Sequence, residues 1–257
     1  MSMSVKKIFL FLGVFVFFAS FAEKKIVSRT KHSHASLLQT NILQANKLYK
    51  QNKYTEALEA YSVINKNKNT PMLFYNMGNC AYKIGDYVQA IIYWSKAKKG
   101  ALLSQLGDIE HNIALAYDKL GASQNITFWS KTKDFVAIFS LLTLQILFLF
   151  LWFLCFVLFY ISKKVGGIKI RIILWVNIFL SFIFGVALFV KHKAINYPDA
   201  IVKTESVLFA GPNTQYHHMG KLSVADKVTV QKSYKKWYKV NSEGVVGWML
   251  SENIEVI

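Results

Sequence analysis

Residues 73–97 read LFYNMGNCAYKIGDYVQAIIYWSKA, and this stretch decides how the first half of the chain is interpreted. Its small and aromatic residues recur 33 positions earlier in the chain. The matching pairs are Ala45 and Gly78, Asn46 and Asn79, Tyr49 and Tyr82, Tyr54 and Tyr87, Ala57 and Ala90, Tyr61 and Trp94, and Ile64 and Ala97. A repeat of this length, with small residues where helices cross and aromatic residues as fillers, indicates stacked pairs of helices.

A third, incomplete copy follows. Residues 108–120 place Ile113, Ala114 and Tyr117 at matching positions, and Gly121 then provides a helix stop. No second helix of this copy is evident, so we predict about two and a half repeats over residues 38–122. A solenoid needs about three repeats to be stable alone. We therefore expect support from the membrane, from a partner or from the helix that precedes Leu38.

The stretch at residues 73–97 resembles the tetratricopeptide repeat family. In that family the first helix of each pair lines a concave groove that binds extended peptides. The resemblance implies a groove formed by Ile42, Asn46, Tyr49, Lys50, Tyr75, Asn79, Tyr82 and Lys83. Each asparagine amide offers a peptide backbone both a donor and an acceptor, and the lysines favour an acidic segment or a C-terminal carboxylate. The alternative is that each asparagine only satisfies the packing of its own helix.

The chain begins with features that are typical of a signal peptide. Lys6 and Lys7 precede an apolar run, and Ser20 and Ala22 then stand at the −3 and −1 positions of a cleavage site. We interpret residues 1–22 as a signal peptide, with an uncleaved anchor as the alternative, and residues 23–37 as a flexible segment.

Two further apolar blocks, residues 135–161 and 172–190, are long enough to cross a bilayer. Residues 162–171 between them carry four positive charges, and short loops rich in lysine and arginine stay in the cytoplasm. We therefore predict a transmembrane hairpin whose two flanking domains both lie on the outer side. The two blocks contain no ionisable pathway residues, only groups such as Gln145 and Asn177 that serve helix packing, so a channel or carrier role is disfavoured.

From residue 199 to residue 257 the pattern changes to short alternating runs. They cover residues 200–203, 207–210, 227–232, 237–240 and 245–249, with glycine-containing turns between them. Five short strands in such a segment indicate a small barrel.

Residues 207–212, 228–230, 237–240 and 247–249 resemble the bacterial SH3-type domain. The residues that carry structural or contact roles in this resemblance are Pro212, Trp237, Tyr238, Gly247 and Trp248. Related domains bind cell-wall peptides or other proteins, and we expect either role here. The alternative is a folded end-piece that docks on a partner or on the chain's own repeats. The loop at residues 211–220 has two histidines and no acidic residue, which argues against recognition of proline-rich peptides.

Several classes of chemistry are disfavoured. The formal charge is +17, but the lysines are dispersed and only Arg29 and Arg171 are arginine, so we expect no nucleic-acid binding. No nucleophile elbow, phosphate loop or HExxH pattern occurs. Cys80 falls in a repeat helix and Cys155 in an apolar block, so we predict no disulfide. We therefore expect that the protein is not an enzyme and that it has no cofactor-binding or metal-binding site.

The whole chain is predicted to be a multidomain membrane protein with all-α tetratricopeptide-like helical repeats, a two-helix transmembrane hairpin and an all-β SH3-like small barrel. This order of parts resembles the BatE-type proteins of the Bacteroides aerotolerance (Bat) group. The resemblance implies a bacterial inner-membrane protein with both soluble domains in the periplasm and a loose link to stress or oxygen tolerance. It also implies von Willebrand factor A-domain membrane proteins, another repeat protein and a regulatory AAA-type ATPase as neighbours.

Two functions follow from this organisation. The first is a non-catalytic adaptor or scaffold that binds partner proteins through the repeat groove. The second is an envelope anchor or sensor whose barrel binds peptidoglycan or cell-wall peptide.

Overall fold

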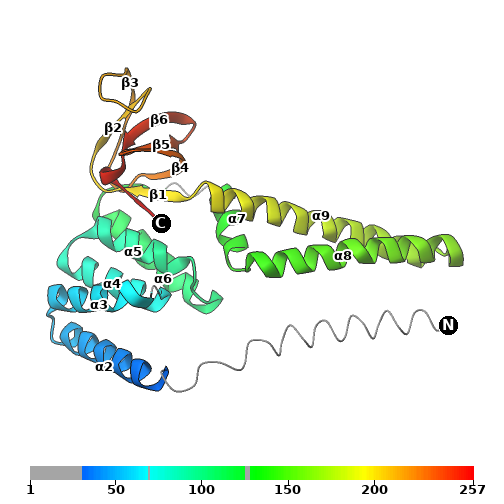
Figure 1. Ribbon diagram of the computed structural model, residues 1–257, viewed down its shortest axis with the longest axis horizontal. Helices are drawn as coiled ribbons and strands as arrows, with labels where there is room; N and C mark the ends of the chain where they lie inside the picture. The colour runs from blue at the N-terminus through cyan, green and yellow to red at the C-terminus, as the bar shows by residue number, and fades with distance from the viewer. Residues whose placement is uncertain (1–30, 69, 125–127) are drawn as a thin grey trace.

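The computed structural model describes residues 31–68, 70–124 and 128–257, so the predicted signal peptide lies outside the described residues. A stack of helices, a long two-helix hairpin and a β barrel are the three parts of the molecule (Figure 1). They confirm the predicted fold class of helical repeats, two long apolar helices and an all-β barrel.

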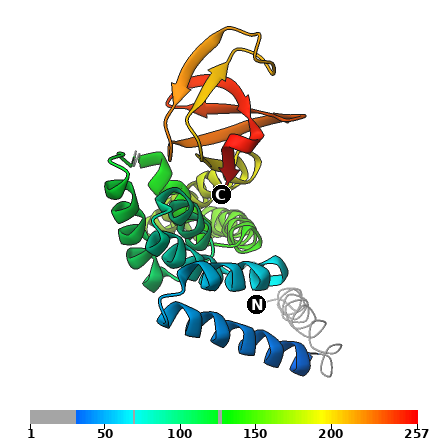
Figure 2. The same ribbon diagram turned by 90° about the vertical axis from the view of Figure 1, so that its left-hand side faces the viewer.

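The repeats form two helix pairs and one further helix, which stack in chain order (Figure 2). Their bounds are α2 (Lys31–Lys50), α3 (Tyr54–Lys68), α4 (Pro71–Ile84), α5 (Tyr87–Lys98) and α6 (Leu103–Lys119). The segment predicted to be flexible, residues 23–37, is helical from Lys31 onward, because these residues contain no glycine or proline that would end the helix.

Local sequence signals set the turns of the second repeat. Thr70 and Asp86 cap α4 and α5 by accepting hydrogen bonds from backbone N–H groups in the first turn of each helix. Gly85, between the two helices, has φ of 93°, a conformation that favours glycine. A Cβ atom on Gly78 would lie 2.5 Å from the Trp94 ring, so this crossing point requires the small residue that the repeat pattern predicts.

The hairpin consists of α8 (Leu141–Ile161), a π-helical turn (Ser162–Gly166) and α9 (Ile168–Asn196). Both helices are long and apolar enough to cross a membrane. The block predicted as one span, residues 135–161, is not one helix. The preceding helix α7 (Phe128–Ala137) ends first, and Ser140 then caps α8 by accepting a hydrogen bond from Thr143 N at 3.0 Å.

Seven strands form the barrel in one antiparallel sheet of order β3-β2-β6-β5-β4-β1-β7. Their bounds are β1 (Asp199–Val202), β2 (Ser206–Phe209), β3 (His218–Leu222), β4 (Lys227–Tyr234), β5 (Trp237–Ser242), β6 (Val245–Leu250) and β7 (Ile254–Val256). The five predicted runs correspond to β1, β2, β4, β5 and β6. The predicted runs leave out two strands, the short closing strand β7 and β3, whose residues are mostly exposed and lack an apolar alternation.

Strand β1 joins the barrel to the repeats, because both of its faces are buried. Ala200 and Val202 belong to the barrel core, whereas Ile201 packs into the core of the repeats with Ile109 and Ile113 of α6. The barrel therefore covers the end of the helix stack (Figure 1). The chain's own barrel therefore supports the incomplete repeats.

Polar contacts strengthen this junction. The Tyr117 hydroxyl donates a buried hydrogen bond to Ala225 O at 3.0 Å. Lys96 of α5 forms an ion pair with Glu255 of β7 at 2.5 Å. Beside the junction, the Asp199 carboxylate lies 2.7 Å from Lys133 Nζ of α7 and 3.1 Å from Lys227 Nζ of β4. Burial opposes ionisation of Asp199, but the two lysines outweigh it and hold the pKa of this carboxyl below its usual value.

Candidate peptide-binding groove and barrel surface

A pocket of about 150 Å³ opens between the helices of the first repeat and α4. Four of the predicted groove residues line it together with two that were not predicted. The lining residues are Asn46, Tyr49, Lys50 and Asn79, as predicted, and Tyr61 and Asn76 in addition. The structure therefore brings half of the predicted groove residues to one place.

The two asparagines are held in equivalent ways in the two repeats. Asn46 Oδ1 accepts a hydrogen bond from the Tyr61 hydroxyl, and Asn79 Oδ1 accepts one from Trp94 Nε1 at 3.1 Å. An indole N–H is only a donor, so the oxygen of Asn79 must face the tryptophan. The fold thus uses both amide oxygens, and the amide N–H groups are the part of each side chain that can serve a ligand.

Protonation of Tyr61 supports this arrangement. Burial, followed by the nearby Cys80 thiol, raises the pKa of Tyr61 to about 12. The hydroxyl therefore remains a donor to Asn46 at neutral pH. Burial also raises the pKa of the Cys80 thiol to about 11, which keeps this cysteine in its protonated, unreactive form.

Two tyrosines predicted to line the groove, one in the first helix of each repeat, also pack within their own repeat. Tyr49 meets Tyr54 edge to face at 5.2 Å between ring centroids, and Tyr82 meets Tyr87 in the same way at 5.3 Å. Each pair fixes the turn between the two helices of its repeat. Lys83 is exposed but, with Tyr82, lies outside the lining of the pocket.

A third asparagine, Asn112, was missed. It follows Asn79 by the repeat length of 33, so the spacing already contained the signal. Its Nδ2 atom donates to the Tyr75 hydroxyl at 3.1 Å, which ties this predicted groove residue to α6 rather than to the pocket. Ile42 is half-buried against the core of the first repeat.

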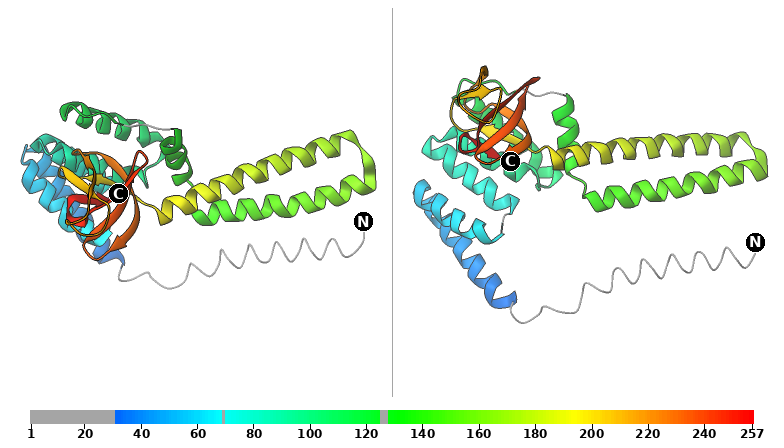
Figure 3. Two further views of the ribbon diagram at one scale, coloured as in Figure 1. Left: turned by 90° about the horizontal axis from the view of Figure 1, so that it is seen from above. Right: turned by 45° about the horizontal axis from the view of Figure 1, so that its top comes forward.

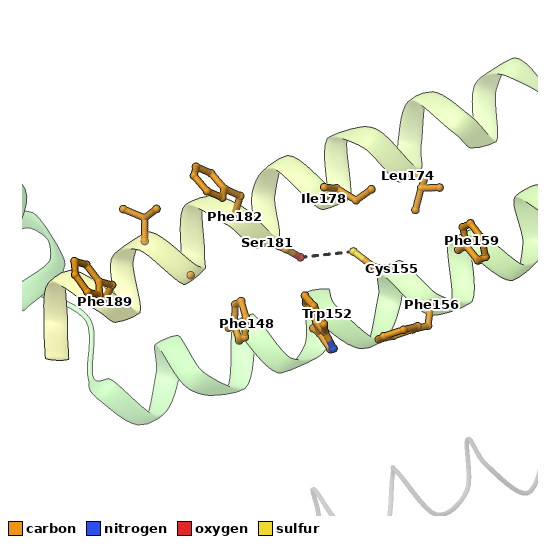
Figure 4. Close-up of a pocket in the computed structure, with 12 residues that line it drawn as sticks. Phe148, Trp152, Cys155, Phe156, Phe159, Leu174, Ile178, Ser181, Phe182 and Phe189 are labelled. Carbon is orange, nitrogen blue, oxygen red and sulfur yellow. Dashed lines mark hydrogen bonds between the residues drawn. The ribbon is translucent and has the colours of Figure 1, made fainter.

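The hairpin carries a second concave surface, an apolar groove of about 740 Å³ between α8 and α9 (Figure 4). Aromatic rings from both helices line it, among them Phe148, Trp152 and Phe182. At its floor Cys155 Sγ donates to Asn177 Oδ1 at 2.8 Å and lies 3.7 Å from Ser181 Oγ. These polar groups join the two helices, which is the packing role expected of such residues in apolar helices.

The outer face of the barrel displays a cluster of aromatic rings. Alternation along the strands turns Phe209, Trp237 and Trp248 away from the barrel core. The Phe209 ring meets Trp237 at 5.7 Å, and Trp248 meets Tyr234 at 6.5 Å between centroids. Lysines lie beside this aromatic face: Lys232 pairs with Lys239 across β4 and β5, Lys239 pairs with Trp248, and Lys235 Nζ lies 5.5 Å from the Tyr234 ring centroid.

The other predicted barrel residues have different surroundings. A Cβ atom on Gly247 would lie 2.9 Å from Leu208 Cβ, so the close approach of β6 to β2 requires glycine here. Tyr238 packs against the barrel core. Pro212 lies half-buried in the loop between β2 and β3. Only Trp237 and Trp248 of the predicted set belong to the aromatic face.

Comparisons with known proteins agree with this description of the barrel. Residues 207–255 match the family model of the bacterial SH3 domain. No curated protein matches the chain. Among solved structures, the chain is similar to NlpC2 from Trichomonas vaginalis, with 16% identity, a TM-score of 0.23 and coverage of 24% of this chain and 23% of that one.

The chain is also similar to yeast Tom70, with 17% identity, a TM-score of 0.32 and coverage of 64% of this chain. It spans 23% and 27% of the lengths of these two proteins, about a quarter of each. The family match alone identifies residues 207–255 as a bacterial SH3 domain. Together with the repeats, it fits a role in protein interaction or in cell-wall binding.

Proposed function

We propose that this protein is a non-catalytic, membrane-anchored adaptor that binds partner proteins through its repeat groove. The observation that carries the proposal is the orientation of Asn46 and Asn79. Their oxygens are held by Tyr61 and Trp94, so the pocket offers a ligand the two amide N–H groups and the Lys50 ammonium. A site rich in donors suits acceptors, such as the backbone carbonyls of an extended segment or a carboxylate.

The hairpin supports the location that we propose for the adaptor. Its two apolar helices span the bacterial inner membrane, the lysine-rich turn faces the cytoplasm, and the repeats and the barrel both lie in the periplasm. The order of the parts supports membership of a Bat-type membrane complex linked to stress or oxygen tolerance. The partners are then von Willebrand factor A-domain membrane proteins and other repeat proteins.

A double variant, Asn46→Asp with Asn79→Asp, tests the groove. Each aspartate keeps an oxygen for Tyr61 or Trp94 but replaces the outward N–H donor by a negatively charged acceptor. We expect the capture of partners to fall at least about tenfold, because hydrogen bonds to charged acceptors contribute about 1.5–3 kcal/mol each. The measurement is crosslinking in intact cells, followed by pull-down and quantitative mass spectrometry.

Asn52→Asp is the matched control. It makes the same chemical change in the first repeat, its Oδ1 accepts from the Tyr54 hydroxyl at 2.6 Å, and it lies outside the pocket lining. It should leave partner capture unchanged, and all three chains should unfold at similar temperatures. Equal capture by the double variant and the native chain would remove the groove from the proposal.

The aromatic face of the barrel favours a second function, an envelope anchor or sensor that binds peptidoglycan or cell-wall peptide. Half-buried rings that face outward offer flat apolar surfaces for sugars, and the neighbouring lysines suit the carboxylates of wall peptides. We expect Trp237→Ala with Trp248→Ala to reduce co-sedimentation with isolated cell walls several-fold. Val245→Ala, at the exposed first residue of β6, should not. Unchanged sedimentation of the tryptophan variant would exclude this face as a wall-binding site.

A further inference from the structure

Helix α7 lies across the end of the hairpin from which the repeats and the barrel extend (Figures 1 and 3). Its last residue, Ala137, is separated from the start of α8 by a three-residue turn. Lys191 Nζ donates to Ala137 O at 3.1 Å. Because Lys191 is the first charged residue after the apolar block 172–190, this bond places the end of α7 where the apolar part of the hairpin stops.

One face of α7 is fixed by all three parts of the molecule. Val136 is 5% exposed and packs with Leu144 and Val190 of the hairpin. Lys133 pairs with Asp199 of the barrel, and Asp134 pairs with Lys98 of the repeats, each at 2.7 Å. These contacts define which side of the helix faces outward.

The outward side carries Lys131 and Phe135, four residues apart, and Phe139 follows in the turn after α7. Phe135 is 62% exposed and Phe139 is 37% exposed, and their ring centroids lie 5.7 Å apart. The apolar surface continues onto α8, where Leu142 is 66% exposed. A pair of exposed phenylalanines that joins the apolar surface of a hairpin needs an apolar environment of its own.

We propose that α7 is an interfacial helix that lies in the headgroup region of the bilayer, and that Phe135 of this helix and Phe139 of the turn after it insert among the lipid chains. Lys131 then lies at the level of the phosphates, as lysines at membrane boundaries do. The occupant of this surface is lipid because the surface is continuous with that of the hairpin, and this inference rests on the proposed membrane anchoring. Since α7 also holds the repeats and the barrel, its contact with lipid sets their orientation above the membrane.

Spin labels on the full-length chain in vesicles of phosphatidylethanolamine and phosphatidylglycerol test the proposal. In a background of Cys80→Ala and Cys155→Ser, single labels are placed by Phe135→Cys, Lys119→Cys and Leu149→Cys. Lys119 is exposed on α6, and Leu149 is 62% exposed on α8. Collision with oxygen reports lipid, and collision with a water-soluble nickel chelate reports water.

The oxygen-to-nickel ratio should be several-fold higher at position 135 than at position 119, and closer to that at position 149. A lipid environment at 149 with a watery one at 135 overturns the inference about α7 and leaves the anchoring intact. Watery labels at both positions overturn the anchoring itself. A label at 135 that neither reagent reaches means that protein, rather than lipid, covers the helix, and this result also overturns the inference.

Discussion

Ile201→Ala will destabilise the repeats by about 2–5 kcal/mol, although Ile201 belongs to the barrel. This side chain is 2% exposed and is buried among residues of α5 and α6. Its removal leaves a cavity at the end of a stack that has no second helix of the third repeat to cover it. The free energy of local opening should fall in α5 and α6, where hydrogen exchange of the backbone amides measures it.

The neighbouring residue provides the control. Val202 is completely buried on the opposite face of the same strand, in the barrel core. Val202→Ala should therefore accelerate exchange in β4 and β7, which pair with β1, more than in α5 and α6. If Ile201→Ala leaves exchange in α5 and α6 at the native rate, the barrel does not stabilise the repeats.

The helices and strands could largely be predicted, because they depend on local patterns. The 33-residue period gave the positions at which Ala45, Gly78, Ala57 and Ala90 let helices cross. The same period contains Asn112, which our interpretation missed. The role of Ile201 could not be predicted in this way. An alternating strand suggests that one face is exposed, and no local signal connects residue 201 with α6, which precedes it by more than 80 positions.

The interruption before α8 was also hidden from the sequence. Residues 135–161 carry no charged side chain, so their hydropathy shows no break. A single serine such as Ser140 is tolerated inside membrane helices. The apolar segment is divided by the cap with which Ser140 begins α8, accepting a hydrogen bond from Thr143 N, and by the contacts that hold α7 against the barrel and the repeats. Those contacts join residues far apart in the chain. The same limit applies to the groove, where the pattern indicated Asn46 and Asn79 but not the bonds that orient them.

Trp94→Ala should have the second large effect, a loss of about 3–5 kcal/mol in the free energy of unfolding. Trp94 is 2% exposed, packs on Gly78 and meets the Tyr82 ring at 5.7 Å between centroids. No neighbouring side chain can fill the volume of the indole. Chemical denaturation of the purified protein, followed by far-ultraviolet circular dichroism, measures the change. Trp129→Ala removes the same side chain from a site that is 43% exposed, and it should change stability much less.

Trp94→Phe distinguishes the packing role of the Trp94 ring from its role in orienting the Asn79 amide. The phenyl ring retains most of the contacts, but the N–H bond to Asn79 is lost, which costs about 1–3 kcal/mol when a half-buried acceptor is left without its partner. Without this bond the Asn79 amide can turn over and present its oxygen to the groove. Partner capture by Trp94→Phe should therefore fall by more than the loss in its free energy of unfolding explains. Full capture by this variant would show that the orientation of Asn79 does not matter for binding, and the repeat asparagines would then be packing residues alone.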